Sequence, residues 1–248
     1  MSPTRFSAAS VPAADAFYLP ADMSRQARLW LAWPLDPTLQ RAIAAIAKAA
    51  AGFQSVGLLA APGAERAARE ALGSAVDEIM PLTAHDVRLR DTGPTFLIDG
   101  KGDAAAADWT FNGWGKRGGE VDADLAHALL DLAEVRRFRA PLTLEGSSFT
   151  TDGRGTLLAL AAAVFDPVRN PGLAPLEAFG IIQDWLGVSR VIWLPDAHPD
   201  DALLTDVRAL AAFIAPGLVA VTDPASSPAA AKVAGHLARA MHRAARSI

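Results

Sequence analysis

Two short segments of the 248-residue chain place a carboxylate beside glycine, where the backbone can turn tightly and present an acidic side chain. They read Arg90-Asp91-Thr92-Gly93-Pro94 and Leu144-Glu145-Gly146. A carboxylate can hold a cation or exchange a proton. Each one also has a purely structural explanation, because Asp91 could cap its own turn and Glu145 could be the buried partner of an arginine.

The chain contains no cysteine, so its 248 residues offer no disulfide, thiolate metal site or thiolate nucleophile. Ser147 and Ser148 follow the second acidic segment, but a serine nucleophile needs an adjacent base. The five histidines fall on expected turns, loops and helices, where solvated or packed histidines are common: His85, His127, His198, His236 and His242. The residues present therefore do not predict covalent catalysis.

Composition excludes several classes of protein. The formal net charge is -4 with 20% charged residues, which gives no basic surface typical of nucleic-acid binding. The longest apolar run, residues 157–165, is shorter than the roughly 20 residues that span a bilayer. Pro12 and Asp15 interrupt any signal-peptide core, so residues 1–17 are expected to be a flexible N-terminus. We expect a cytoplasmic protein that binds neither nucleic acid nor membrane.

Short apolar stretches alternate with helical patterns, which predicts an α/β fold for a single domain over residues 1–248. The expected strands cover residues 29–33, 56–60, 95–98, 156–163, 190–194 and 218–221. The expected helices cover residues 37–51, 122–135, 175–186 and the segment after Ser227-Pro228. The alanine run over residues 104–107 is attributed to coding bias or tight packing.

Seven motifs occur in one order along the chain. They are an opening motif made of Leu19-Pro20-Ala21-Asp22 and Leu31-Ala32-Trp33-Pro34, followed by Arg90 to Pro94, Asp108 to Gly115, Leu144-Glu145-Gly146, Asp166 to Leu173, Trp193-Leu194-Pro195 and Ala215-Pro216-Gly217. In this order they resemble the agmatine deiminase and bacterial peptidylarginine deiminase family. The resemblance implies a pentein fold, in which ββαβ units form an α/β propeller around a central site. The family continues beyond Ile248, so we expect an incomplete propeller lacking its C-terminal blades.

The resemblance also implies a reaction. Family enzymes hydrolyse agmatine to N-carbamoylputrescine and ammonia, a step toward putrescine, without a metal or organic cofactor. A cysteine near the family's C-terminus attacks the guanidinium carbon, and a histidine transfers protons. By this resemblance Asp91 and Asp201 would bind the substrate and Glu145 would be catalytic. The family's histidine position is Asp206, and the carboxylate that follows it is Arg208.

Three further positions depart from the family pattern and would alter the pocket. An aromatic residue two places before the Arg-Asp motif is replaced by Arg88, the tryptophan of the opening motif by Met23, and a glycine by Ser147. An aromatic face attracts a guanidinium, whereas Arg88 repels it. We therefore expect Arg88 or Arg208 to pair with Asp91 or Glu145 and to close the pocket internally.

These observations leave three functions open. The main prediction is a catalytically inactive family member that acts as a scaffold or as a sensor of an agmatine-like guanidinium, with a homo-oligomer covering the open edge. The first alternative is an active guanidine hydrolase whose missing residues come from a partner. The second is an interaction protein that uses the basic residues of its last helix: Lys232, Arg239, Arg243 and Arg246. A solvated polar face opposite a buried stripe is the simpler explanation of that helix.

Overall fold

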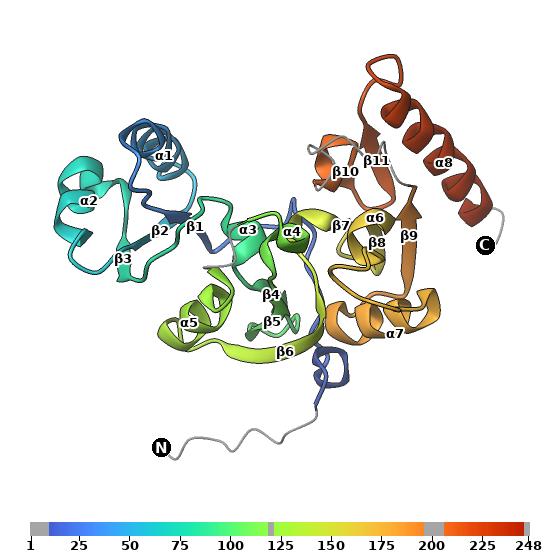
Figure 1. Ribbon diagram of the computed structural model, residues 1–248, viewed down its shortest axis with the longest axis horizontal. Helices are drawn as coiled ribbons and strands as arrows, with labels where there is room; N and C mark the ends of the chain where they lie inside the picture. The colour runs from blue at the N-terminus through green and yellow to red at the C-terminus, as the bar shows by residue number, and fades with distance from the viewer. Residues whose placement is uncertain (1–9, 119–121, 196–205, 246–248) are drawn as a thin grey trace.

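The structure is a computed structural model that describes residues 10–118, 122–195 and 206–245. Its units follow one another along an arc, with α1, α2, α5, α7 and α8 on the outer side (Figure 1). The first unit is a parallel sheet of β1 (Arg28–Ala32), β2 (Ser55–Ala60) and β3 (Glu78–Pro81). Its crossovers are α1 (Pro37–Ala50) and α2 (Glu65–Leu72).

The second and third units share one ββαβ topology. In the second, β4 (Thr95–Ile98) and β5 (Ala104–Thr110) are antiparallel, and β6 (Arg136–Thr143) returns parallel to β5 after α5 (Leu125–Leu132). In the third, β7 (Phe149–Thr151), β8 (Thr156–Leu160), α7 (Pro175–Leu186) and β9 (Arg190–Leu194) repeat this order. The repeated ββαβ unit expected from the resemblance is therefore confirmed.

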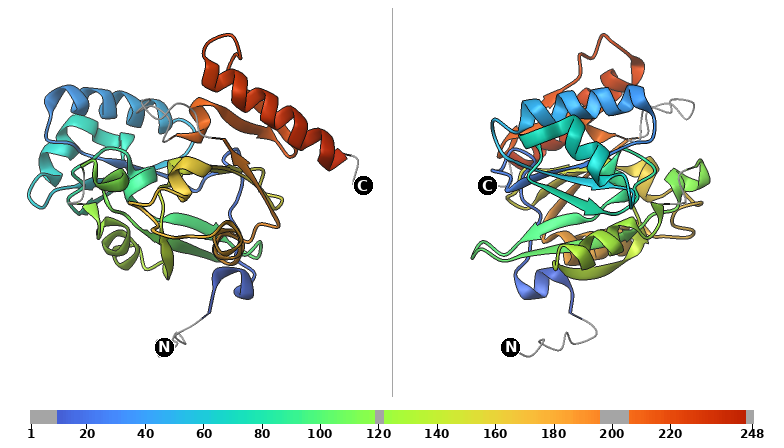
Figure 2. Two further views of the ribbon diagram at one scale, coloured as in Figure 1. Left: turned by 45° about the vertical axis from the view of Figure 1, so that its right-hand side comes forward. Right: turned by 90° about the vertical axis from the view of Figure 1, so that its left-hand side faces the viewer.

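A hairpin follows the third unit and is covered by the last helix. It pairs β10 (Ala211–Ala215) with β11 (Leu218–Val221), and α8 (Pro228–Ala245) packs over it. Figure 2 shows this helix on the opposite side of the molecule from the short helix η1 (Pro12–Asp15). Val233 and Leu237 of α8 are buried in a cluster with Leu158 and Ile192, so its apolar stripe packs on the core.

Short helical turns connect the strands and helices within and between these units. They are η2 (Gly73–Ala75), α3 (Leu89–Thr92), α4 (Gly113–Lys116), η4 (Gly146–Ser148), α6 (Ala161–Val164) and η5 (Val207–Ala209). Three of them, α3, α4 and η4, precede or follow a strand end on the inner side of the arc. Asp91, Glu145 and Asp206 lie on or directly before three of these turns, α3, η4 and η5.

Hydrophobic cores join neighbouring units. One cluster combines Leu97 and Trp109 of the second unit with Phe149 and Ile182 of the third. A second fills the first unit between its sheet and α1 and α2. No helix among the residues the structure describes is long and apolar enough to cross a membrane. The cytoplasmic localisation stays a prediction.

Three expectations differ from the structure. The strand expected over residues 156–163 ends at Leu160, because Ala161 to Val164 form the helical turn α6, for which alanine has a high propensity. Residues 1–17 were expected to be flexible, but residues 10–17 are ordered, since η1 lies there and Phe17 is buried in the core. The helix expected over residues 122–135 is shortened to α5.

Candidate functional site

Asp91 lies on α3 and points into the interior. Asp91 is only 7% exposed. One carboxylate oxygen accepts a hydrogen bond from the indole Nε1 of Trp114 at 3.0 Å, and the other accepts one from the backbone N–H of Ser147 at 2.9 Å. Two neutral donors thus orient this carboxylate without neutralising it.

Glycine at position 146 permits this arrangement. A Cβ at Gly146 would lie 2.2 Å from the carbonyl oxygen of Arg90, closer than any side chain tolerates. The absence of a side chain lets η4 approach α3, which brings the Ser147 N–H to Asp91. Arg90 reinforces the approach by donating its Nε–H to the carbonyl of Gly146 at 2.9 Å. The two acidic motifs found in the sequence therefore pack directly on each other.

Trp114 is positioned by a left-handed turn. The four residues of α4, Gly113 to Lys116, all have positive φ angles, of 71°, 53°, 78° and 62°. Glycine adopts such angles readily, whereas they cost a tryptophan or lysine roughly 1–3 kcal/mol. The side chain of Asn112 stabilises the turn by accepting a hydrogen bond from Gly115 N at 2.9 Å. Phe111 packs edge-on against the indole, with ring centroids 4.8 Å apart.

Glu145 is fully buried and paired with Arg169. The Nε of Arg169 lies 2.9 and 3.1 Å from the two carboxylate oxygens of Glu145, and its Nη1 lies 2.6 Å from Asp166. Burial raises the pKa of Glu145, and the charge of Asp91 adds to this, although Arg169 opposes the shift. The short turn η4 connects the two carboxylates, because the backbone N–H of Ser147 donates to Asp91 and the hydroxyl of Ser148 lies 3.3 Å from Glu145. In the described part of the chain, Nη2 of Arg169 has no hydrogen-bond partner.

The loop that carries Arg169 packs against the left-handed turn. Asn112 donates its side-chain N–H to the carbonyl of Val168 at 3.1 Å. A Cβ at Gly115 would lie 3.0 Å from Nη1 of Arg169. Asn170 completes the support by bonding both backbone groups of Thr143 at 2.9 Å. Both acidic residues are thus held by one continuous polar network.

Arg88 covers the exposed side of this network. Its guanidinium carbon lies 3.8 Å from the centroid of the Trp114 ring. Its Nε and Nη2 donate to the two carboxylate oxygens of Asp86, at 2.9 and 2.8 Å. These hydrogen bonds raise the pKa of Arg88, and the charge of Asp91 contributes further. A cation therefore already occupies the aromatic face beside Asp91.

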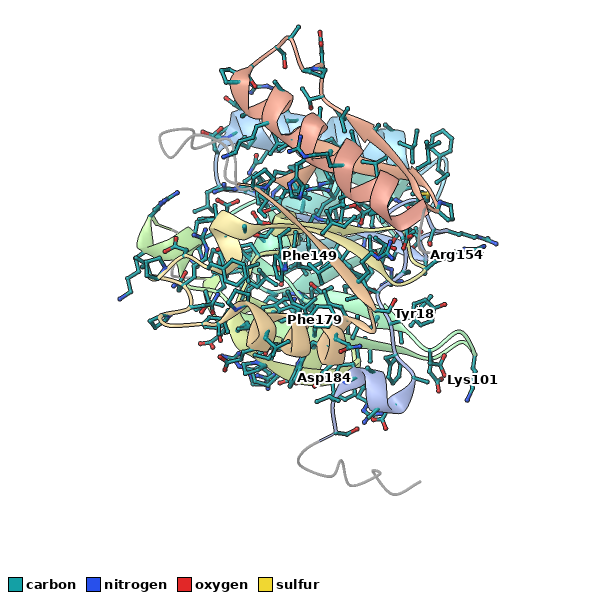
Figure 3. The ribbon with its side chains drawn as sticks, turned by 90° about the vertical axis from the view of Figure 1, so that its right-hand side faces the viewer. Tyr18, Lys101, Phe149, Arg154, Phe179 and Asp184 are labelled. Atoms are coloured by element: carbon teal, nitrogen blue, oxygen red, sulfur yellow. The ribbon has the colours of Figure 1, made fainter. Side chains whose placement is uncertain are left out.

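Asp206 and Arg208 form a closed pair on η5. The Nε and Nη2 of Arg208 donate to the carboxylate of Asp206 at 3.0 and 2.9 Å. Although burial opposes the change, these hydrogen bonds lower the pKa of Asp206. Arg208 also lines a cavity of about 430 Å3 together with Asp22, Arg90 and Phe149. Figure 3 shows Phe149 in the interior, with Arg154 and Lys101 at the periphery.

The expectation that Arg88 or Arg208 pairs with Asp91 or Glu145 is wrong. Arg88 and Arg208 do not hydrogen-bond to Asp91 or Glu145 within the described residues; they bond to the aspartates two residues before them. The arginine on Glu145 is instead Arg169, because it lies on the loop that packs against α4. The buried Glu–Arg pair considered from the sequence is therefore confirmed.

The remaining predicted positions have mixed outcomes. Ser147 is buried, and its backbone N–H donates a hydrogen bond to Asp91. Met23 is 42% exposed on a turn. Asp201 lies outside the described residues, as does His198. His85 pairs with Asp122 and His127 with Asp131, which explains both without a catalytic role.

Sequence reasoning missed the roles of Trp114 and Arg169. Both lie in motifs that were noted, but neither was assigned to the site. The four-residue pattern Gly-Trp-Gly-Lys after Asn112 is a signal for positive φ angles, and it could have identified the turn. No group of acidic or histidine side chains in the described ranges is suited to hold a metal ion.

The repeated ββαβ units and the interior carboxylates define an α/β protein of the pentein fold. A family model described as Porphyromonas-type peptidyl-arginine deiminase matches residues 18–246, and the chain belongs to this family. A relative from Streptomyces avermitilis is 38% identical, covering 87% of this chain and 68% of its own length. Agmatine deiminase of Stutzerimonas stutzeri is 34% identical, covering 88% and 64%.

Solved structures agree with this assignment. The agmatine deiminase of Enterococcus faecalis superposes with a TM-score of 0.84 at 29% identity, over 93% of this chain and 68% of that one. The chain thus spans about two thirds of the length of the relatives it matches.

Proposed function

We propose that this chain provides the guanidinium-binding part of a deiminase that acts on agmatine or a related guanidine. The cysteine and the proton-transfer group would come from residues outside these 248, in the same assembly. One observation carries the proposal. Of Asp91, Glu145 and Asp206, only Asp91 has no arginine hydrogen-bonded to it in the described part of the chain. It is therefore the carboxylate left to receive a cationic ligand.

The reaction assigns a part to each group. Asp91 would hold the planar cation by a charge-assisted hydrogen bond. A thiolate from outside the chain would attack the central carbon, ammonia would leave with a transferred proton, and water would release the ureido product. Glu145, whose pKa is raised by burial, would keep a proton available at higher pH than an exposed carboxyl. The relatives named as agmatine deiminases support agmatine as the substrate to test first.

The absence of cysteine makes the proposal directly testable. The tagged chain is isolated from its own cells with its native partners, and ammonia release from agmatine is measured before and after iodoacetamide. Because the 248 residues hold no thiol, turnover that iodoacetamide abolishes, and that a disulfide-forming reagent abolishes until dithiothreitol restores it, uses a cysteine supplied from outside. The Asp91→Asn variant is expected to lower this turnover at least 100-fold, and Arg154→Gln, an exposed matched control, is expected to leave it unchanged. Turnover by the isolated chain that survives alkylation would contradict the proposal.

A second candidate is an inactive protein that binds a guanidinium as a sensor. It is favoured by the closed pair of Asp206 and Arg208, at the two positions where the resemblance implies a histidine and a carboxylate. Saturable agmatine binding by calorimetry that Asp91→Asn weakens at least tenfold, with no turnover in any native assembly, would select this candidate. A homo-oligomer at the propeller edge remains a proposal as well, and sedimentation velocity would test it.

The interaction role of α8 receives less support. Its residues Val233 and Leu237 pack on the core, so the apolar stripe that a partner would need is already used. A solvated basic face opposite that stripe explains the helix.

A further inference from the structure

Arg88 places its guanidinium on the aromatic face beside Asp91, where an external guanidinium could also stack. It stacks on Trp114 at 3.8 Å, the distance of a close cation–π contact. The edge of that indole donates its N–H to Asp91. Trp114 is only 7% exposed, so Arg88 covers most of what remains of its face. Any ligand that reaches Asp91 along the indole must first move this side chain.

The segment before Arg88 holds the guanidinium in place. The carboxylate of Asp86 accepts two hydrogen bonds from this guanidinium, and it also accepts one from the Arg88 backbone N–H at 2.8 Å. Asp86 is in turn fixed by its own backbone N–H, which donates to the buried carboxylate of Asp122 at 2.9 Å. The Arg88 side chain is still 56% exposed, so it can swing into solvent without disrupting the core.

We propose that Arg88 is a tethered guanidinium that competes with external guanidines for the face of Trp114 beside Asp91. The inference rests on the proposed function, because it concerns access to the same carboxylate. A tethered group acts at an effective concentration on the order of millimolar or higher, so it raises the apparent dissociation constant of any external guanidine for the same face. Arg88 would thus weaken the binding of every external guanidine, so that only guanidines with further contacts to the protein bind at low concentration.

The geometry is tested first, without any ligand. Ring current above an indole shifts the Nε–H proton of a stacked arginine to lower frequency in a proton–nitrogen NMR spectrum. Arg28 over Trp30 and Arg136 over Phe138 should also give shifted resonances. We expect the resonance of Arg88 to be the shifted one that disappears in Arg88→Gln and loses its shift in Trp114→Leu. Arg154→Gln should leave it in place. An Arg88 resonance that is the same in wild type and Trp114→Leu would overturn the proposal.

Competition is tested with methylguanidinium as the probe. Binding is followed through the Trp114 indole N–H resonance, assigned by its loss in Trp114→Phe. We expect Arg88→Gln to bind at least tenfold more tightly than wild type, Arg88→Lys to fall between them, and Arg154→Gln to match wild type. The gain should vanish in the double variant Arg88→Gln with Asp91→Asn.

The outcomes separate this inference from the proposed function. If wild type binds methylguanidinium, Asp91→Asn abolishes binding, and Arg88→Gln changes nothing, then Arg88 is no competitor and the function stands. If neither wild type nor Arg88→Gln binds the probe, both are wrong. Binding that appears only after Arg88→Gln would support both.

Discussion

Arg169 donates its Nε–H to both carboxylate oxygens of Glu145, and the two side chains are 2% and 1% exposed. This pair joins the second and third units of the propeller at their inner ends. Removing charges from water is costly, so such a pair is stable only while both members are present.

Replacing Arg169 alone should destabilise the protein strongly. We expect Arg169→Met to lower the free energy of unfolding by about 3–5 kcal/mol, because Glu145 stays buried without its partner. The double variant Arg169→Met with Glu145→Gln should recover much of this loss. Unfolding is best followed in urea, since guanidinium is a candidate ligand. Equal losses in the single and double variants would contradict the account.

Glu145 should make the free energy of unfolding fall as pH rises, which is the opposite of the usual effect of a carboxylate. Because burial raises its pKa above the usual 4.5, the folded protein keeps a proton that the unfolded chain has lost. The free energy of unfolding therefore falls as pH rises from about 4.5 through the folded pKa, and then levels off. Subtracting the values for Glu145→Gln from those for wild type should isolate this fall.

Asp206 provides a control of opposite sign. Burial opposes the change, but Arg208 lowers the pKa of Asp206 below its usual 3.8. Its contribution is present above about pH 3.8 and is lost as pH falls through the folded pKa. The difference between wild type and Asp206→Asn should therefore shrink on acidification. If the free energies of unfolding of wild type and Glu145→Gln change with pH in parallel, the pKa of Glu145 is not raised in the folded protein.

Gly146 should not tolerate alanine. The added Cβ would meet the Arg90 carbonyl at 2.2 Å, which forces η4 away from α3 and breaks the hydrogen bond from Ser147 to Asp91. We expect a loss of about 2–4 kcal/mol in urea unfolding, in the range of severe single substitutions. Gly180 is a matched control on α7 with nothing within 4 Å, and Gly180→Ala should stabilise by about 0.5–1 kcal/mol.

Replacing Lys116 with glycine should stabilise the protein, whereas the same replacement at another exposed lysine should destabilise it. Its φ of 62° is strained for lysine, so Lys116→Gly should raise the free energy of unfolding by about 0.5–1 kcal/mol. Lys101 is a loop residue without positive φ, and Lys101→Gly should lower stability by about 0.5–1 kcal/mol through unfolded-chain entropy. Equal effects of the two substitutions would show that the left-handed turn is absent in solution.

Elements with strong local signals are predictable from this sequence. Strands β4, β9 and β11 begin and end at the expected residues because each is a short apolar run closed by a turn. Helix α1 begins at Pro37, where Asp36 caps two backbone N–H groups. Strand β5 was missed because alanine has a low β propensity. Its residues Ala105 to Ala107 are fully buried, so tertiary packing decides their conformation.

The same limit applies to the candidate site. Asp91 and Glu145 were identified because carboxylates beside glycine are visible in sequence. The partner of Glu145 could not be assigned, since Arg169 is 24 residues away and reaches it only through the packing of its loop on α4. The aromatic face used by Arg88 depends on the handedness of residues 113–116, which no periodic pattern reports.

The left-handed turn has an evolutionary consequence. Its two non-glycine residues keep their backbone angles because Asn112 reaches the Val168 carbonyl and Gly115 lies against Arg169. The two loops are therefore expected to coevolve, although more than 50 residues separate them in the chain. Substitutions in residues 112–116 should accumulate in relatives only together with changes in residues 166–170, whereas the exposed faces of α1 and α2 should vary independently.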